Sequence, residues 1–304
     1  MVKEQLKFAV VCARGLGDAL LSMVLAHNLT LSGVCVTVFS SILSELKEWF
    51  PNYQILPFPA PHQFETVFAT FDTIIAADHS LINEHHQFGN QLIVLKEENF
   101  NKSRTMVENL QVISAEILSL PVASCENGIT PPHGVIWRAH PNRVIIHPMS
   151  SDVKKNWPAE KFIALGHYLE KEGFYPYFCM CPSERVSWKT SVPEDRLPHF
   201  LTISALAAFV YESGYLIGND SGVGHLASLL NIPTLTLFAR KSYSTLWRPG
   251  WGPGKVVCPP NILFGSRMKQ KYWKNLLSVR RVRKAFIRDL LSEGENASAS
   301  LPLT

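Results

Sequence analysis

The 304-residue sequence lacks the patterns that mark several common protein classes. It has no run of the roughly 18 apolar residues that a membrane-spanning helix needs, and Arg14 and Asp18 end the apolar stretch near its start, so no signal peptide is predicted. The six cysteines form neither a C-x-x-C pair nor a zinc-ligand spacing. We therefore expect a cytoplasmic protein with free thiols, and we expect Cys179 and Cys181, which alternate along a predicted strand, to pack in the core.

Motifs of common phosphate and hydrolase chemistries are also missing. The sequence contains no G-x-x-x-x-G-K-[ST] phosphate loop and no G-x-S-x-G nucleophile elbow. Its first glycine-containing turn is no G-x-G-x-x-G fingerprint, because Leu20 stands where the third glycine would be. There is no D-x-D pair to hold a divalent cation against a diphosphate, so no metal site is predicted.

Charge is unevenly divided along the chain. Residues 1–140 carry 8 Lys and Arg against 13 Asp and Glu, a net charge of −5, whereas residues 141–304 carry 21 against 12, a net charge of +9; the sum is the +4 of the whole chain. Nine basic residues and one acid, Asp289, lie between Gly265 and Leu290. A basic second half suits an anionic ligand or surface, and a solvated basic helix explains this segment equally well. No nucleic-acid partner is expected.

Short apolar strands alternate with helical patterns, which predicts an α/β fold with parallel sheets. In the first half we expect strands at 7–12, 34–39, 73–77 and 91–95, and helices at 19–32, 41–50 and 105–118. Four prolines from Pro121 to Pro141 predict a linker. Beyond it we expect strands at 143–147, 175–180, 215–218 and 234–238, and helices at 159–173, 203–211 and 222–230. The sequence thus predicts two Rossmann-like domains, 1–140 and 141–304, with ligands at the carboxyl ends of their strands.

Asp18 stands at the first strand-to-helix turn, just after Gly15 and Gly17. Glycine lets a ligand approach the backbone closely, and a helix start favours an anion. From position alone, Asp18 is more often a first-turn acid that satisfies backbone N–H groups. The functional interpretation is a general base that takes a proton from a hydroxyl group.

The segment His147–Pro158 follows a strand and gathers hydroxyl and ammonium groups before a helix. Ser150 and Ser151 would donate hydrogen bonds to a diphosphate, and Lys155 would supply a compact positive charge. A solvated polar loop is the alternative. In either case Trp157 is expected to be a packing anchor.

The segment Gly218–His225 is the most specific local signal. Asp220 ends a strand, and Ser221, Gly222 and Gly224 surround a helix start whose N–H groups and dipole would face a phosphate. His225 would donate to the same anion, although a lone histidine is more often structural. Glu184, after another strand, would accept hydrogen bonds from ribose hydroxyls or be an ordinary surface acid.

Together these motifs resemble the ADP-heptose:lipopolysaccharide heptosyltransferases of glycosyltransferase family nine, which have the GT-B fold of two Rossmann-like domains facing across a cleft. The likeness is strongest from about 144 to 238 and from Arg14 to Leu25. Gly17-Asp18 resembles the family's early G-D, and Lys155-Asn156-Trp157-Pro158 resembles its K-x-W-P. Asp220 to His225 resembles its D-[ST]-G-x-x-H donor loop.

The resemblance implies a glycosyltransferase that uses no cofactor and takes its sugar from a nucleotide-diphosphate donor, ADP-heptose. Residues 141–304 would hold this donor, and residues 1–140 would lie on the side of the acceptor, lipopolysaccharide core or a related glycan. Asp18 would be the catalytic base, Lys155 would contact the diphosphate, and Ser150 and Glu184 would bind phosphate and ribose. The transfer would be inverting and metal-independent.

The sequence departs from the family after residue 238, where Ala239-Arg240-Lys241-Ser242 replaces a Gly-Pro-Thr-like turn. The sugar could therefore differ from heptose. Two alternatives follow: a GT-B enzyme with another donor, such as an epimerase or a UDP- or GDP-sugar transferase, and a non-catalytic donor-binding relative. The basic segment 267–288, predicted as a helix, would pack on the first domain or rest on anionic lipid at the inner face of the inner membrane.

Overall fold

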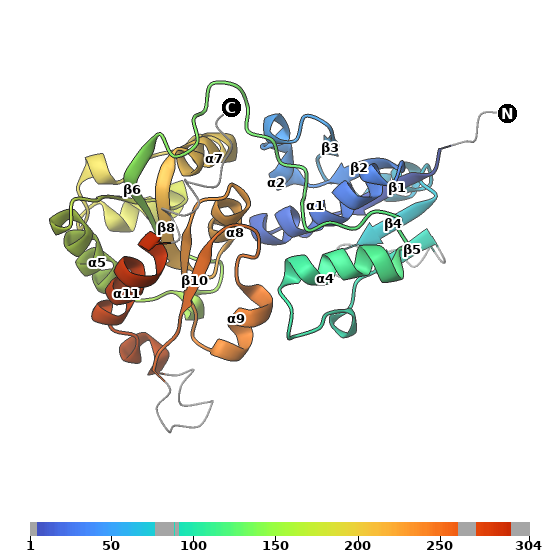
Figure 1. Ribbon diagram of the computed structural model, residues 1–304. Coiled ribbons are helices and arrows are strands. Elements are labelled where there is room, and N and C mark those ends of the chain that lie inside the picture. Colours follow the sequence, from blue (N-terminus) through green and yellow to red (C-terminus); the bar gives the residue numbers. More distant parts are fainter. Residues whose placement is uncertain (1–4, 77–87, 89–90, 261–271, 293–304) are drawn as a thin grey trace. The chain divides into compact units, whose positions relative to one another are not determined.

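The computed structural model describes residues 5–76, 88, 91–260 and 272–292. The chain divides into two compact units, Met1–Pro132 and His133–Thr304, and the division falls inside the segment predicted as a linker. Each unit holds one five-stranded sheet with helices packed on it (Figure 1). All strand pairs are parallel. The predicted α/β architecture with two Rossmann-like sheets is confirmed.

The N-terminal unit has the strand order β3-β2-β1-β4-β5. Its strands are β1 (Lys7–Val11), β2 (Cys35–Phe39), β3 (Gln54–Leu56), β4 (Thr73–Ala76) and β5 (Leu92–Val94). Its α-helices are α1 (Leu16–Leu31), α2 (Ser41–Ser44), α3 (Phe64–Phe68) and α4 (Met106–Val112), which continues as a π-helical turn, Ile113–Ile117. The order of the strands reverses between β1 and β4, so the turn after β1 lies at a topological switch point.

The C-terminal unit has the strand order β10-β9-β8-β6-β7, with its switch point between β6 and β8. Its strands are β6 (His140–His147), β7 (Tyr175–Phe178), β8 (Ser213–Asn219), β9 (Thr234–Leu237) and β10 (Gly254–Val257). Its α-helices are α5 (Ala159–Lys171), α6 (Pro182–Arg185), α7 (Ile203–Tyr211), α8 (Gly222–Leu229), α9 (Lys241–Trp247) and α11 (Val279–Ala285), which continues as a π-helical turn, Phe286–Leu290.

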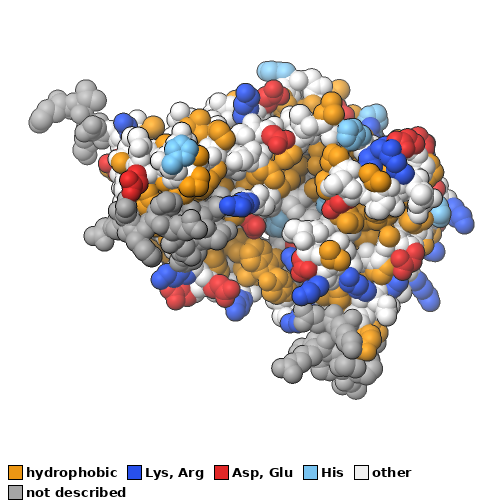
Figure 2. Space-filling view, turned by 180° about the vertical axis from the view of Figure 1, so that it is seen from behind, with side chains coloured by type: hydrophobic (Ala, Val, Ile, Leu, Met, Phe, Trp, Pro, Cys, Tyr) orange, Lys and Arg blue, Asp and Glu red, His pale blue; other side chains and the backbone are white. Residues whose placement is uncertain are grey.

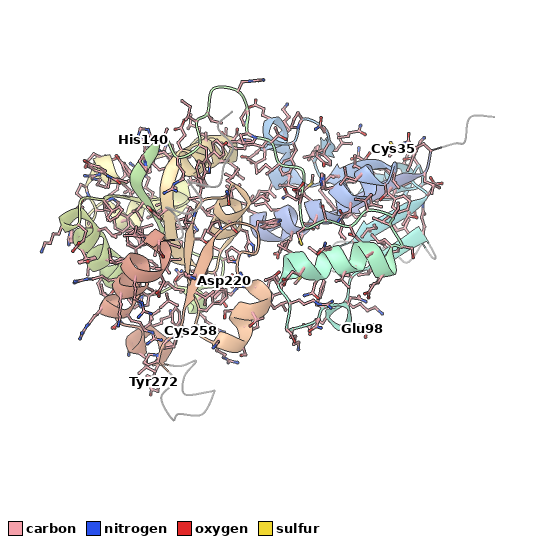
Figure 3. All side chains as sticks on the ribbon, in the orientation of Figure 1. Cys35, Glu98, His140, Asp220, Cys258 and Tyr272 are labelled. Carbon is pink, nitrogen blue, oxygen red and sulfur yellow. The ribbon has the colours of Figure 1, made fainter. Side chains whose placement is uncertain are left out.

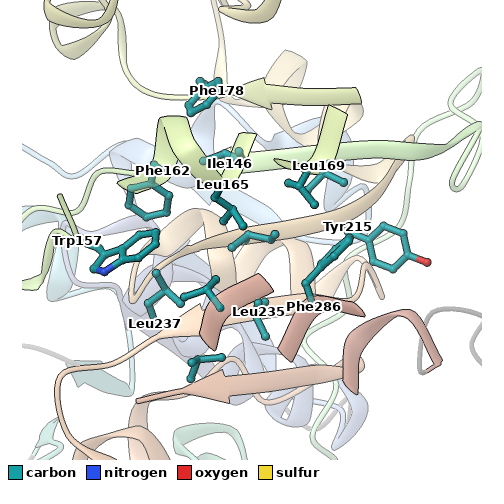
Figure 4. Packing of buried hydrophobic residues seen from close by; sticks show 14 of the residues in the cluster. Ile146, Trp157, Phe162, Leu165, Leu169, Phe178, Tyr215, Leu235, Leu237 and Phe286 are labelled. Carbon is teal, nitrogen blue, oxygen red and sulfur yellow. The ribbon is translucent and has the colours of Figure 1, made fainter. Parts of the chain in front are cut away.

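Both cores contain aromatic side chains that pack against one another. In the N-terminal unit, Phe68 packs edge-on against Phe39, with ring centroids 5.0 Å apart. In the C-terminal unit, Trp157 packs edge-on against Phe162 at 5.0 Å, and Phe286 packs against Tyr215 at 5.3 Å (Figure 4). In the C-terminal unit, these rings pack between the sheet that carries the predicted donor residues and the helices α5 and α11.

The basic segment near the end of the chain differs from the single helix that was predicted. Residues 272–276 are helical, and the helix ends before Ser278, whose hydroxyl accepts a hydrogen bond from the Arg281 N–H and starts α11. Val282, Phe286 and Leu290 are buried in the core, so the apolar stripe of this segment packs inward. Residues 267–271 of the predicted helix lie outside the described residues.

Other local predictions were also too simple. The helix predicted at 41–50 is α2 followed by a 3₁₀ turn, Lys47–Trp49. Cys179 is buried as predicted, but Cys181 is exposed, because β7 ends at Phe178 and the chain then turns into α6.

No helix among the described residues combines the length and apolar character that spanning a bilayer requires. On the face shown in Figure 2, Lys and Arg side chains lie in separate places rather than in one continuous patch.

Candidate functional site

The switch point of the C-terminal sheet brings together two segments that are far apart in the sequence. β6 and β8 are neighbouring parallel strands, and His147 at the end of β6 pairs with Gly218 near the end of β8. The loop Pro148–Trp157 and the turn at Asp220 therefore leave the sheet side by side at its carboxyl edge. Open α/β sheets bind their ligands at such edges.

Lys155 and Asp220 form an ion pair across these two segments. The Nζ of Lys155 donates to Oδ2 of Asp220 at 2.7 Å, and the two side chains are 43% and 10% exposed (Asp220 is labelled in Figure 3). Burial lowers the pKa of Lys155, but the carboxylate of Asp220, helped by Tyr243 and Asp152, outweighs it and raises the pKa above its ordinary value. Lys155 is therefore a fixed, fully protonated cation at neutral pH.

The buried amide of Asn219 holds the loop to the sheet. Its Nδ2 donates to the Pro148 carbonyl at 2.6 Å, and its Oδ1 accepts from the Trp157 N–H at 3.1 Å. Trp157 is 2% exposed, as expected for a packing anchor. Sequence reasoning missed Asn219, and its position directly before Asp220 was the available signal.

Ser150 uses its hydroxyl within the loop. Its Oγ lies 2.9 Å from the Asp152 carbonyl and 2.8 Å from Oδ1 of Asn156, and its one proton serves one of these acceptors at a time. A phosphate would compete with both for that proton. Ser151 is exposed next to it.

The first turn of α8 begins with a capping serine. Ser221 is the N-cap, and its Oγ accepts from the Gly224 N–H. Gly222 opens the helix, where the first N–H groups have no partner within the helix. His225 follows and is buried.

His225 is neutral because of its surroundings. Burial lowers its pKa, the Asp220 carboxylate opposes this, and Lys155 lowers the pKa further. Its Nδ1 is buried without a hydrogen-bond partner among the described residues. Its ring packs edge-on against Trp251, with centroids 6.2 Å apart.

His147 is a second buried histidine at this edge, and sequence analysis named it only as the first residue of its segment. Its Nδ1 lies 2.8 Å from the Cys179 carbonyl, which can only accept, so the Nδ1 carries the proton. Burial lowers the pKa of His147, partly offset by that carbonyl and by Glu184. The carboxylate of Glu184 accepts from the Cys181 N–H at 3.1 Å and thus caps its own helix, α6.

A cavity of about 660 Å³ lies beside the ion pair. Of the predicted donor residues it includes only Lys155 and Asp220. The wall is basic, with four cationic and two acidic side chains; the lining residues are Asp152, Lys154, Lys155, Asp220, Leu237, Phe238, Ala239, Arg240, Tyr243, Trp273 and Lys274. The turn at Ala239 and Arg240, where the sequence departs from the family pattern, forms part of this wall.

Asp18 lies in the N-terminal unit, at the third residue of α1 and exposed. The N-cap of α1 is Gly15, which has no side chain to cap the helix. The Oδ2 of Asp18 lies close to Gly15, since a Cβ placed there would be 3.2 Å away. The position of Asp18, exposed at a helix start, fits both interpretations: a first-turn acid that stabilises the helix and a general base.

Among residues 5–76, 88, 91–260 and 272–292, no group of three or more His, Cys, Asp and Glu side chains is placed to hold a metal ion.

Comparison with solved structures shows which fold the chain has. A family 9 glycosyltransferase from Veillonella parvula superposes with a TM-score of 0.72 at 17% identity, over 96% of this chain and 99% of that one. The ADP-heptose lipopolysaccharide heptosyltransferase II of E. coli superposes with a TM-score of 0.70 at 14% identity, over 95% and 99%. At these identities the likeness is one of fold, and the fold is that of the GT-B heptosyltransferases.

Comparison of sequences then shows which family the chain resembles. The family model described as glycosyltransferase family 9 (heptosyltransferase) matches residues 119–259. Lipopolysaccharide heptosyltransferase 3 of Escherichia coli is 27% identical over 116 residues, which span 36% of this chain and about a third, 34%, of that relative's length. The resemblance to family 9 is confirmed, and it indicates a glycosyltransferase.

Proposed function

We propose that the protein transfers a sugar from a nucleotide-diphosphate donor, ADP-heptose, to lipopolysaccharide core or a related glycan, with inversion at the anomeric carbon. The observation that carries this proposal is the Lys155–Asp220 pair at 2.7 Å beside the capped start of α8, at the switch point of the C-terminal sheet. The names of the related proteins supply the donor and acceptor classes.

The donor diphosphate would be held by charge and by backbone N–H groups. Lys155 brings a cation whose position Asp220 fixes, and the start of α8 adds N–H groups and the positive end of the helix dipole. Because these groups are in place before the bond breaks, they stabilise the negative charge that develops on the departing diphosphate. They would do so without a metal ion, so transfer should withstand EDTA.

Asp18 would take the proton from the acceptor hydroxyl. Its carboxylate is exposed at the start of α1, where an incoming hydroxyl can reach it. The deprotonated oxygen would then attack the anomeric carbon on the face opposite the diphosphate, which inverts the configuration. This role needs the sugar to be delivered to Asp18 when both substrates are bound.

Donor binding tests the proposal before any acceptor is known. Purified protein is titrated with ADP, UDP, GDP and ADP-heptose while its melting temperature is recorded, because a ligand of the native state raises that temperature. We expect shifts with ADP and ADP-heptose, and smaller shifts at the same ligand concentrations in Lys155→Ala. A shift with UDP or GDP alone would contradict the heptose donor and favour another nucleotide-sugar enzyme. No shift with any of the four would contradict the donor site itself.

A further inference from the structure

Two buried tryptophans exchange hydrogen bonds between the loop that carries Lys155 and a segment near the end of the described chain. Nε1 of Trp157 donates to the Leu277 carbonyl at 3.0 Å. Nε1 of Trp273 donates to the Lys154 carbonyl at 3.2 Å. Both rings are 2% exposed. We call residues 148–157 the Lys155 loop and residues 273–277 the brace.

Two lysines strengthen the same contact. Nζ of Lys274, in the brace, donates to the Val153 carbonyl at 2.9 Å. Nζ of Lys161, in α5, donates to the carbonyls of Lys274 at 2.6 Å and Leu277 at 3.0 Å. These carbonyls end the helix at 272–276, where a cation is favourable and the carbonyls lack helical partners. The brace is therefore held in place from the side of α5.

The brace fixes the backbone directly before Lys155. The carbonyls of Val153 and Lys154 are each bound by a brace side chain, and Lys155 is the last residue of the 3₁₀ turn that contains both. On the other side of Lys155, Asn219 binds the Trp157 N–H. Hydrogen bonds thus hold the backbone on both sides of Lys155, while its Nζ reaches Asp220.

The brace also belongs to the wall of the cavity. Trp273 and Lys274 line it together with Lys155, and both lie beyond residue 259, where the family match ends. From these contacts we propose that the brace is a working part of the donor site and that Trp273 is a positioning residue, whose N–H sets the place of Lys155 through the Lys154 carbonyl.

A double-mutant cycle separates positioning from general packing. Affinities for ADP and for inorganic pyrophosphate are measured by calorimetry for Trp273→Phe, Lys155→Ala and the double variant. Trp273→Phe keeps an aromatic ring but loses one hydrogen bond, and we expect ADP to bind roughly fivefold more weakly. In the Lys155→Ala background the same change should have no further effect. An equal loss in both backgrounds would overturn the proposal. Trp188→Phe, at another buried tryptophan of the same core cluster, is the matched control.

A second measurement needs no ligand. In protein labelled with ¹³C at lysine Cε, the titration of Lys155 is followed by NMR, and its signal is assigned from its absence in Lys155→Ala. Because Asp220 raises the pKa of Lys155, a loosened loop should lower it. We expect Trp273→Phe to shift the titration in the direction of Asp220→Asn, and Trp188→Phe to leave it unchanged. An unchanged titration in Trp273→Phe would overturn the proposal that the brace positions Lys155.

The proposed role rests on the proposed function, but the two fail separately. If wild-type protein binds neither ADP nor pyrophosphate, the proposed donor site is wrong. The titration still decides whether Trp273 positions Lys155.

Discussion

The two switch points of the molecule have the same topology and different chemistry. In the N-terminal unit, the turn after β1 leads into a helix whose N-cap, Gly15, has no side chain, and it presents an exposed carboxylate, Asp18. In the C-terminal unit, the corresponding edge carries a buried amide, Asn219, and the paired Lys155 and Asp220. A shared topology thus offers two ligand edges, and at the second a cation is held in place by an ion pair and a buried amide.

This difference matches what the proposed function requires of each edge. A multiply charged diphosphate needs donors whose positions are set in advance, and buried polar groups remain stable only when they are hydrogen-bonded. A general base needs access to the substrate and must be able to take up its proton, so an exposed carboxylate suffices. We therefore expect the C-terminal unit to control binding and Asp18 to control the rate.

The largest effect is expected at Asp18. Asp18→Asn should lower the rate of transfer about 10²- to 10⁴-fold, because the amide cannot take a proton, while ADP affinity stays within roughly twofold. Rates are measured as nucleotide release with acceptor present. Glu65→Gln, at an exposed acid of α3 in the same unit, is the control. A rate for Asp18→Asn equal to that of the control would show that Asp18 only caps α1.

A smaller effect is expected at Lys155. Lys155→Ala should weaken ADP binding on the order of tenfold to a hundredfold, since it removes a hydrogen-bonding cation and leaves Asp220 to repel the diphosphate. Calorimetry measures the affinity, and Lys171→Ala, at an exposed lysine at the end of α5, should bind like wild type. Equal affinities in the two variants would place the diphosphate elsewhere.

Substitutions at two glycines separate the effect of close packing from that of ligand contact at the carboxyl edge of the C-terminal sheet. A Cβ at Gly218 would lie 2.7 Å from the His147 carbonyl oxygen, so Gly218→Ala should lower the free energy of unfolding by about 1–3 kcal/mol. A Cβ at Gly224 would meet only Pro249 and Ser221, at 3.7 and 3.9 Å. The Gly224→Ala variant should therefore have the same free energy of unfolding as the wild type. Urea unfolding measures both. If a phosphate lies against α8, Gly224→Ala should nevertheless weaken ADP binding, and undiminished affinity would argue against that contact.

The smallest effect concerns pH. His147 and His225 have pKa values below their ordinary 6.5 because they are buried. As pH falls below about 6.5, the unfolded chain takes up protons at these histidines before the folded chain does, so stability should decline from that pH downward. Urea unfolding from pH 7 to 5 should show a shallower decline in the variant that combines His147→Gln with His225→Gln. His199→Gln, at an exposed histidine, should leave the decline unchanged; an equally steep decline in the double variant would assign it to other groups.

Much of the fold follows from local sequence patterns. The helix predicted at 203–211 is α7 with the same bounds, and the strand predicted at 34–39 is β2, which begins one residue later. β3 and β10 were not predicted, since β3 has three residues and β10 begins with a glycine after Pro253. Neither offers the apolar run that marks a strand.

The site was foreseen only in part. Lys155, Asp220 and Ser221 are recognisable because their motifs are local. Asn219 and Trp273 act through partners that the fold alone brings near: the Asn219 amide spans Pro148 and Trp157, and Trp273 reaches the Lys154 carbonyl 119 residues earlier. Such pairs leave no spacing signal in a single sequence.

Sugar transfer itself tests the account most directly. The protein is incubated with ADP-heptose and lipopolysaccharide-core acceptors that lack heptose, and the product is analysed by mass spectrometry and by NMR of the new anomeric centre. We expect one added heptose of inverted configuration, one ADP released for each transfer, and loss of product in Asp18→Asn. Retention of configuration would contradict the inverting mechanism, and full transfer by Asp18→Asn would contradict the assignment of the base to Asp18.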